Sequence, residues 1–285
     1  MGAVWGITPT LGKIIMEAGH RPFGILVWTL IVSATMSGVV TLLRGKGLPI
    51  NRQTIPLFFG IAILGEVVPH FMTYTAVLHL PAGIVAIGLT LVPMFAMPIA
   101  LGLGLEKPAP IRFLGTILGA VAILLIVGPD TGLPDPSKAW YVLLVIIAAF
   151  CYGGEGNFLT WYGDRKLDAM QILFGASLIS LLIAVPNAII FNQFINPFQT
   201  WHLAEFLILL SAIISAMTYV TYIWLIGQAG PVFSSQVAYL VTGFGVIWSM
   251  ALLGERFSFW VWMAFVLMIV GISLVQPRES KRRTS

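Results

Sequence analysis

Charged residues are scarce in this sequence. Asp, Glu, Lys and Arg make up 9% of the 285 residues, whereas hydrophobic residues make up 58%. The mean hydropathy is +0.96. A soluble domain of this size is roughly a quarter charged, so the shortage excludes a protein whose main solvent is water.

Cysteine and spare length are also in short supply. The one cysteine, Cys151, lies in an apolar run and excludes any intrachain disulfide. A membrane-spanning helix needs about 20 apolar residues. Ten such helices take about 200 residues and leave roughly 85 for loops and termini, which excludes a separate soluble domain. The first apolar stretch has no basic residue ahead of it, which argues against a secretory signal.

Long apolar stretches account for most of the chain. They are bounded by turn and charge signals and fall at about 2–18, 23–43, 54–79, 82–105, 111–128, 139–162, 168–190, 203–227, 231–253 and 257–276. Tight breaks at Leu80–Gly83 and Gly227–Pro231 divide runs that are otherwise far too long to span once. We therefore predict an all-α integral membrane protein of ten transmembrane helices.

The Lys and Arg residues predict the orientation. Eleven of the fifteen fall in alternate connections on one side, and three fall on the other, namely Arg21, Lys138 and Arg256. Cytoplasmic loops carry the excess of Lys and Arg. Both termini are therefore expected in the cytoplasm, which agrees with an even number of helices.

The second five stretches repeat the first five. The segment Tyr74–Lys107 is echoed by Tyr222–Arg256, and Trp5-Gly6 is echoed by Tyr152-Gly153. Because five is odd, the two repeats must lie in the membrane with opposite orientation, an arrangement typical of transporters with a site near the midplane. The expected organisation is a five-helix repeat at 1–128, a linker at 129–138, a second repeat at 139–277 and a basic cytoplasmic tail at 278–285.

Several short motifs accompany this repeat. Lys13 follows Trp5-Gly6 by eight positions, Pro93 precedes Glu106-Lys107 by thirteen, and Gly254-Glu255-Arg256 opens the last hairpin. With these motifs the chain resembles the EamA-type ten-helix members of the drug/metabolite transporter superfamily over essentially its whole length. The resemblance implies export or exchange of metabolites such as amino acids.

Two positions depart from that family's pattern. Thr242 stands thirteen residues before Glu255, where the family has a proline. Thr29 stands in the second stretch, where family members often carry an arginine. A charge-pairing role for the second helix therefore does not carry over to this chain.

Glu66 is the most conspicuous polar residue inside a stretch. A charge near the bilayer centre costs about 2.5–3.5 kcal/mol, so it needs a role. His70 and Tyr74 follow on the same helix face, and Pro69 is expected to kink the helix. One interpretation is a polar cavity in which Glu66 and His70 bind substrate or carry a proton. The alternative is a structural ion pair with Lys13, since both lie roughly 16–18 Å along their helices from the cytoplasmic side.

Further polar residues gather in the second repeat. Glu155 and Asn157 lie among glycines, and small polar residues follow helical spacing in 203–227; the latter also fit plain hydrogen bonding between helices. Trp5 fits either an interfacial belt or a pocket wall. The candidate substrate-binding residues are Trp5, Glu66, His70, Tyr74, Thr90, Glu155, Asn157, Thr218, Tyr222, Gln236 and Tyr239.

These observations predict a multi-pass transporter of a bacterial-type inner membrane. It would export or exchange a small, amino-acid-like or other organic solute by alternating access, with proton coupling through Glu66 and His70. We expect no cofactor, no metal, no enzymatic chemistry and no nucleic-acid partner, and a monomer would suffice. Alternatives are a ligand-sensing or scaffold membrane protein, or an intramembrane enzyme.

Overall fold

In the computed structural model, the described residues are 1–107, 110–127, 135–163, 165–198, 200–230, 234 and 237–274. All regular elements among them are helices. Those of the first half are α1 (Gly2–Trp5), α2 (Thr8–Glu17), α3 (Pro22–Leu43), α4 (Thr54–Ile61), η1 (Ala62–Val67), α5 (Val68–His79), α6 (Ala82–Gly88), α7 (Leu91–Gly102) and α8 (Pro110–Val127). Those of the second half are η2 (Pro136–Tyr141), α9 (Val142–Tyr162), α10 (Ala169–Ile190), α11 (Leu203–Ala229), α13 (Val237–Leu253) and α14 (Phe259–Leu274).

Six helical segments among the described residues are long and apolar enough to cross a membrane. They are Pro22–Leu43, Thr54–His79, Ala82–Gly102, Ser137–Tyr162, Ala169–Ile190 and Leu203–Ala229. Shorter apolar helices cover Phe113–Ile126, Leu240–Leu253 and Phe259–Gly271. The first predicted stretch, 2–18, is divided into the short helices α1 and α2 by a turn at Gly6–Ile7.

The third predicted helix changes its winding in the middle. It begins as α4, widens into the π-helical turn η1 and continues as α5. Pro69 lies two residues after the end of η1 and has no N–H to donate to the carbonyl of Gly65, four residues earlier. The expected kink at Pro69 is thus realised as a π-turn, and such turns are frequent at functional sites.

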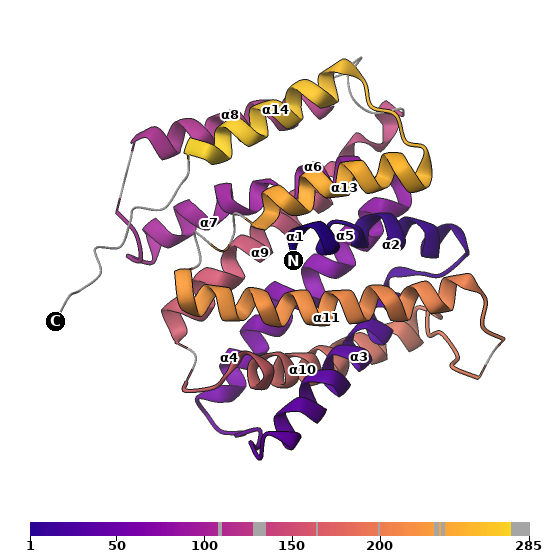
Figure 1. Cartoon of the computed structure of the whole chain (residues 1–285), viewed down its shortest axis with the longest axis vertical. Helices are drawn as coiled ribbons and strands as arrows, with labels where there is room; N and C mark the ends of the chain where they lie inside the picture. Colours follow the sequence, from indigo (N-terminus) through magenta and orange to yellow (C-terminus); the bar gives the residue numbers. More distant parts are fainter. Residues whose placement is uncertain are drawn as a thin grey trace.

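The helices of the two halves pack in matched pairs. Figure 1 shows α8 beside α14 along one edge of the molecule and α3 with α10 at the opposite end. Between these pairs, α7 packs against α9, and α13 packs against α1 and α6. Three of these contacts, α8 with α14, α3 with α10 and α6 with α13, join equivalent helices of the two halves. The contact of α7 with α9 has its counterpart in the contact of α13 with α1. The chain therefore has a two-repeat architecture.

Two glycines allow the central helices to approach closely. A Cβ at Gly6 would lie 2.5 Å from the carbonyl oxygen of Val241 on α13. A Cβ at Gly153 would lie 2.9 Å from the carbonyl oxygen of Val92 on α7. Trp5-Gly6 and Tyr152-Gly153, which the sequence pairs as repeat equivalents, therefore make equivalent helix contacts.

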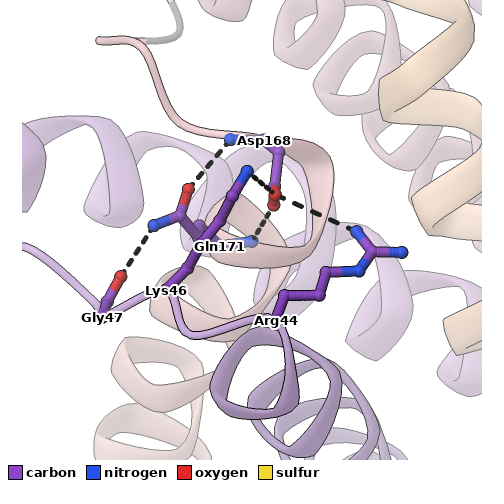
Figure 2. Close-up of polar contacts among 5 residues, drawn as sticks. All are labelled: Arg44, Lys46, Gly47, Asp168 and Gln171. Atoms are coloured by element: carbon purple, nitrogen blue, oxygen red, sulfur yellow. Dashed lines mark hydrogen bonds and ion pairs between the residues drawn. The ribbon is translucent and has the colours of Figure 1, made fainter.

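The loop after α3 holds the start of α10. Asp168 is the N-cap of α10, where its side chain accepts a hydrogen bond from the backbone N–H of Gln171 at 3.0 Å. Lys46 donates to the Asp168 carboxylate at 2.8 Å, and Arg44 lies 4.0 Å from it (Figure 2). The Gln171 amide donates to the carbonyl oxygen of Gly47 at 2.7 Å. We call this group the charged clasp.

The loop after α10 holds the start of α3 in the same way. The side-chain oxygen of Gln193 accepts a hydrogen bond from the backbone N–H of Phe23 at 2.9 Å. The indole N–H of Trp28 donates to the carbonyl oxygen of Ile195 at 3.2 Å. We call this group the neutral clasp. The charged clasp ties the first half to α10, and the neutral clasp ties the second half to α3.

Candidate substrate cavity and buried carboxyl pair

An aromatic cavity of about 90 Å³, partly open to the outside, lies between the two halves. Its lining includes Trp5 and Tyr74 from the first half and Tyr152 and Tyr222 from the second, with His70 among them. The remaining lining residues are Thr8, Pro9, Thr73, Leu89, Val92, Ser215, Val237, Ala238 and Val241. The wall therefore contains no lysine, arginine, aspartate or glutamate side chain among the described residues.

The rings in the cavity are set at steep angles to one another. Trp5 meets Tyr222 edge to face with 5.8 Å between ring centroids, and His70 meets Tyr152 edge to face at 6.2 Å. His70 also lies 5.8 Å from Tyr74. Tilted rings leave π-faces and polar edges open to a ligand, and these suit planar or cationic groups.

The hydrogen-bond geometry defines the role of each His70 nitrogen. The Nδ1 atom lies 2.8 Å from the backbone carbonyl oxygen of Glu66. A carbonyl oxygen only accepts, so Nδ1 carries a proton. In the neutral ring Nε2 is then a hydrogen-bond acceptor for a ligand.

The carboxylate of Glu66 lies away from His70 and bonds to α10. Glu66 is 3% exposed. The hydroxyl of Ser177 donates to one carboxylate oxygen at 2.7 Å, and the hydroxyl of Ser180 donates to the other at 2.6 Å. Both serines were missed as site residues in the sequence, although their spacing of three on an otherwise apolar helix was a usable signal.

A second buried carboxyl, Glu155 on α9, lies close to Glu66. It is 1% exposed, and one of its oxygens accepts a hydrogen bond from the hydroxyl of Tyr219 on α11. The other oxygen has no hydrogen-bond partner among the described residues. The carboxyl packs against the backbone of Gly65, the residue directly before Glu66, where any Cβ would collide with it. The absence of a side chain at position 65 thus makes room for the pair.

A smaller space of about 10 Å³, roughly the volume that one water molecule needs, adjoins the aromatic cavity and Glu66. It shares Trp5, His70 and Ser215 with the cavity, and it also contacts Glu66 and Tyr219. The cavity and the carboxyl pair are therefore neighbouring parts of one polar centre.

Comparison with protein families decides the class of the molecule. The family model described as the EamA-like transporter family matches residues 1–128 and 139–276. The chain belongs to the EamA-like transporter family. It is a multi-pass membrane protein, and the transporter class expected from its motifs is confirmed.

Solved structures agree on the fold. One structure, described only as the crystal structure of a protein, has a TM-score of 0.65 and 16% sequence identity. The match covers 96% of this chain and 97% of that one, and at this identity it shows the fold alone. A comparison with curated proteins gave no match.

Lys13 of this EamA-like transporter does not pair with Glu66. Its ammonium group donates to the carbonyl oxygen of Leu80 at 3.3 Å and lies 3.9 Å from Glu17. It lies in a separate polar pocket at the end of α5, with Glu17, His79, Asp135, Lys138 and Glu255. The sequence-based depth of Lys13 in the membrane was wrong because Trp5 already lies at the level of the cavity. Lys13, eight residues further along, therefore lies beyond the cavity, near the end of α5. The direct pairing of the Glu66 carboxylate with His70 is likewise corrected.

Two other predicted site residues in this transporter hold helices together, and a third bonds within its own helix. Asn157 donates to the carbonyl oxygens of Ala96 and Gly153, each at 2.8 Å. Thr90 is fully buried and bonds to Met268 on α14, and Thr218 bonds to the carbonyl of Ile214 on its own helix. Gln236 and the side chain of Tyr239 lie outside the described residues.

The departures from the family pattern have local roles in this chain. Thr242 donates to the carbonyl oxygen of Ala86 at 2.8 Å and so joins α13 to α6. Thr29 bonds to the carbonyl oxygen of Ile25 and lies 3.5 Å from the hydroxyl of Tyr74. Within the described residues, no cluster of three His, Cys, Asp or Glu side chains is arranged to hold a metal ion.

Proposed function

We propose that this protein exports or exchanges a small organic solute by alternating access around the aromatic cavity. The proposal takes the chain as ten transmembrane helices in two inverted five-helix halves, residues 1–128 and 139–277. The observation that carries it is the composition of the cavity wall. Trp5 and His70 come from one half, whereas Tyr152 and Tyr222 come from the other. Rocking one half against the other would move one wall relative to the opposite wall.

The lining supports a solute with an aromatic or alkylammonium group. Aromatic rings attract cations and stack with planar groups. The acceptor nitrogen of His70 and the hydroxyl of Ser215 supply a few polar contacts. A strongly anionic solute would find no basic side chain on the described wall. An aromatic amino acid or an aromatic ammonium compound therefore fits better than a dicarboxylate.

The membrane setting follows from the charge distribution. Eleven of the fifteen Lys and Arg residues lie in alternate connections, which supports two cytoplasmic termini in a bacterial-type inner membrane. No covalent step is needed for transport, and one chain supplies the whole cavity. A reporter after Ser285 should be cytoplasmic and a tag within 129–138 should be external; labelling of both on one side would contradict ten helices.

Counterflow in liposomes tests the transport proposal. Protein-containing vesicles loaded with unlabelled L-tryptophan or tetraphenylphosphonium should take up the labelled compound, whereas L-glutamate should give no signal. Trp5→Ala should weaken this uptake, and the control Trp224→Ala, whose side chain is 57% exposed and does not line the cavity, should retain it. Binding without counterflow in intact vesicles would favour the ligand-sensing alternative instead.

A further inference from the structure

The carboxyl pair is the part of the polar centre that solute binding alone does not explain. Glu66 and Glu155 are buried, and neither lines the aromatic cavity. In the described part of the chain, no lysine or arginine makes an ion pair with either of them. Two unpaired carboxylates side by side in a low-dielectric interior are unstable, and such groups become neutral instead.

The hydrogen bonds distinguish the two members of the pair. Both oxygens of Glu66 accept from serine hydroxyls, which is the arrangement that a carboxylate prefers. Glu155 accepts from Tyr219 at one oxygen, and in the part of the chain that the structure describes the other oxygen has no partner. A carboxylic acid with one unpaired oxygen costs less than an unpaired buried charge. The geometry therefore places the charge on Glu66 and the proton on Glu155.

The surroundings contain no group that replaces this proton. The titratable side chains coupled to the pair are Tyr219 and Tyr222 on α11 and Tyr152 and Cys151 on α9. His70 on α5 adjoins Glu66, and Tyr74 lies 5.8 Å from His70 between ring centroids. Of these groups His70 alone has a cationic form, and its proton-bearing Nδ1 is bonded to a backbone carbonyl.

We infer that Glu66 and Glu155 form a proton-binding pair that holds a single proton on Glu155, and that the solute is exchanged against this proton. The small space past His70 and Ser215 adjoins the aromatic cavity, Glu66 and Tyr219, the hydrogen-bond donor to Glu155. When the cationic group of the solute enters the cavity, it favours the ionised carboxyl, and the proton leaves the pair through this space to water; when the solute leaves, water refills the cavity and Glu155 takes up a proton again. The exchange of solute against proton rests on the proposed transport function, whereas the proton held on Glu155 does not.

Infrared spectroscopy of the purified protein, in the absence of any solute, tests whether Glu155 carries a proton. At neutral pH the wild type should show the carbonyl stretching band of a protonated buried carboxylic acid, and glutamate labelled with ¹³C at the carboxyl carbon should shift it. Glu155→Gln should remove the band. The control Glu17→Gln should keep it, because the Glu17 side chain is 62% exposed and distant from the pair. An unlabelled wild type without the band, or a band that survives in Glu155→Gln, would overturn the assignment.

Transport in liposomes then tests the exchange. With L-tryptophan or tetraphenylphosphonium as probe, a pH gradient should drive accumulation in the wild type. In Glu155→Gln this accumulation should fall to the level of protein-free liposomes, a larger loss than that of counterflow in the same preparation. Accumulation driven by a sodium gradient instead, or equal loss of counterflow at normal protein yield, would contradict proton exchange. If neither probe is transported but the infrared band behaves as expected, the transport proposal for these solutes fails and the proton pair stands.

Discussion

The two halves of the molecule share a frame but differ in chemistry. Trp5 and Tyr152 are repeat equivalents, and both line the cavity. Glu66 has Ile214 as its equivalent, and Glu155, three residues after Tyr152, has Thr8, three residues after Trp5. Both carboxyls therefore lie where η1, α9, α10 and α11 meet, and the matching place in the other half has none. The comparison indicates that both halves pack around the cavity in the same way, whereas the two carboxyls lie only on the side formed by η1, α9, α10 and α11.

The shared frame should fail in the same way when either half is disturbed. Gly6→Ala and Gly153→Ala each place a Cβ at 2.9 Å or less from backbone atoms of another helix. Such overpacking costs about 1–3 kcal/mol, so both should lower the melting temperature and the monodisperse yield in detergent. Gly154→Ala is the control, since its nearest neighbour would be the Cδ1 of Ile99 at 3.8 Å. Equal stability of Gly153→Ala and Gly154→Ala would show that the close contact is not required.

The different chemistry predicts unequal effects at Glu66 and Ile214. Glu66→Leu leaves the buried hydroxyls of Ser177 and Ser180 without their acceptor, at a cost of about 1–3 kcal/mol. Ile214→Leu is an apolar exchange of equal volume and should cost less than about 1.5 kcal/mol. Thermal unfolding in detergent measures both. Adding Ser177→Ala and Ser180→Ala to Glu66→Leu should restore stability, whereas adding Lys13→Met should not; rescue by Lys13→Met would reinstate an ion pair.

Trp5 and Tyr152 should contribute equally to solute binding if the cavity is built symmetrically. Loss of one cation–π or stacking contact costs about 0.5–2 kcal/mol, which is roughly a 2- to 30-fold rise in Kd. Equilibrium binding of tetraphenylphosphonium to Trp5→Ala and Tyr152→Ala should show rises of similar size. The control Trp161→Ala changes a side chain that is 58% exposed. A rise in Kd for one variant alone would place the ligand against a single half.

The two clasps give the smallest effect and differ in their response to pH. Burial opposes ionisation of Asp168, but its hydrogen bonds with Lys46 and the Gln171 backbone outweigh this and hold its pKa below the usual range. Its contribution is therefore present above the ordinary aspartate range and is lost as the pH falls through the lowered folded-state pKa.

Asp168→Asn should lower stability by about 1 kcal/mol or less near neutral pH, and the difference from wild type should vanish in strong acid. Gln193→Ala in the neutral clasp should cost a similar amount at every pH, because no charge is involved. Melting temperatures in detergent across a pH series compare the two. A pH-independent Asp168→Asn effect would mean that the ion pairs contribute nothing.

The sequence supplied most of the helical segments and part of the aromatic wall, but Tyr152, which also lines the cavity, was not among the predicted site residues. Hydropathy located the apolar stretches, and the repeat linked Trp5-Gly6 to Tyr152-Gly153 before their contacts were known. The partners of the carboxyls could not be obtained in this way. Helical spacing places Glu66 on the same face as His70, but the π-turn at Ala62–Val67 alters that register. Which helix lies opposite is a tertiary fact, so the bonds of Glu66 to α10 and of Glu155 to Tyr219 required the structure.

The crossed clasps also set an order of events during synthesis. The helix α3 packs mainly against α10 and α11, which belong to the later half of the chain. At about 5–20 residues per second, roughly 6 to 24 s separate the emergence of Lys46 from that of Asp168. During this interval α3 lacks its main helix partners, and the charged clasp has not yet formed. We therefore expect nascent chains of this protein to stay associated with the membrane-insertion machinery until α10 has been inserted.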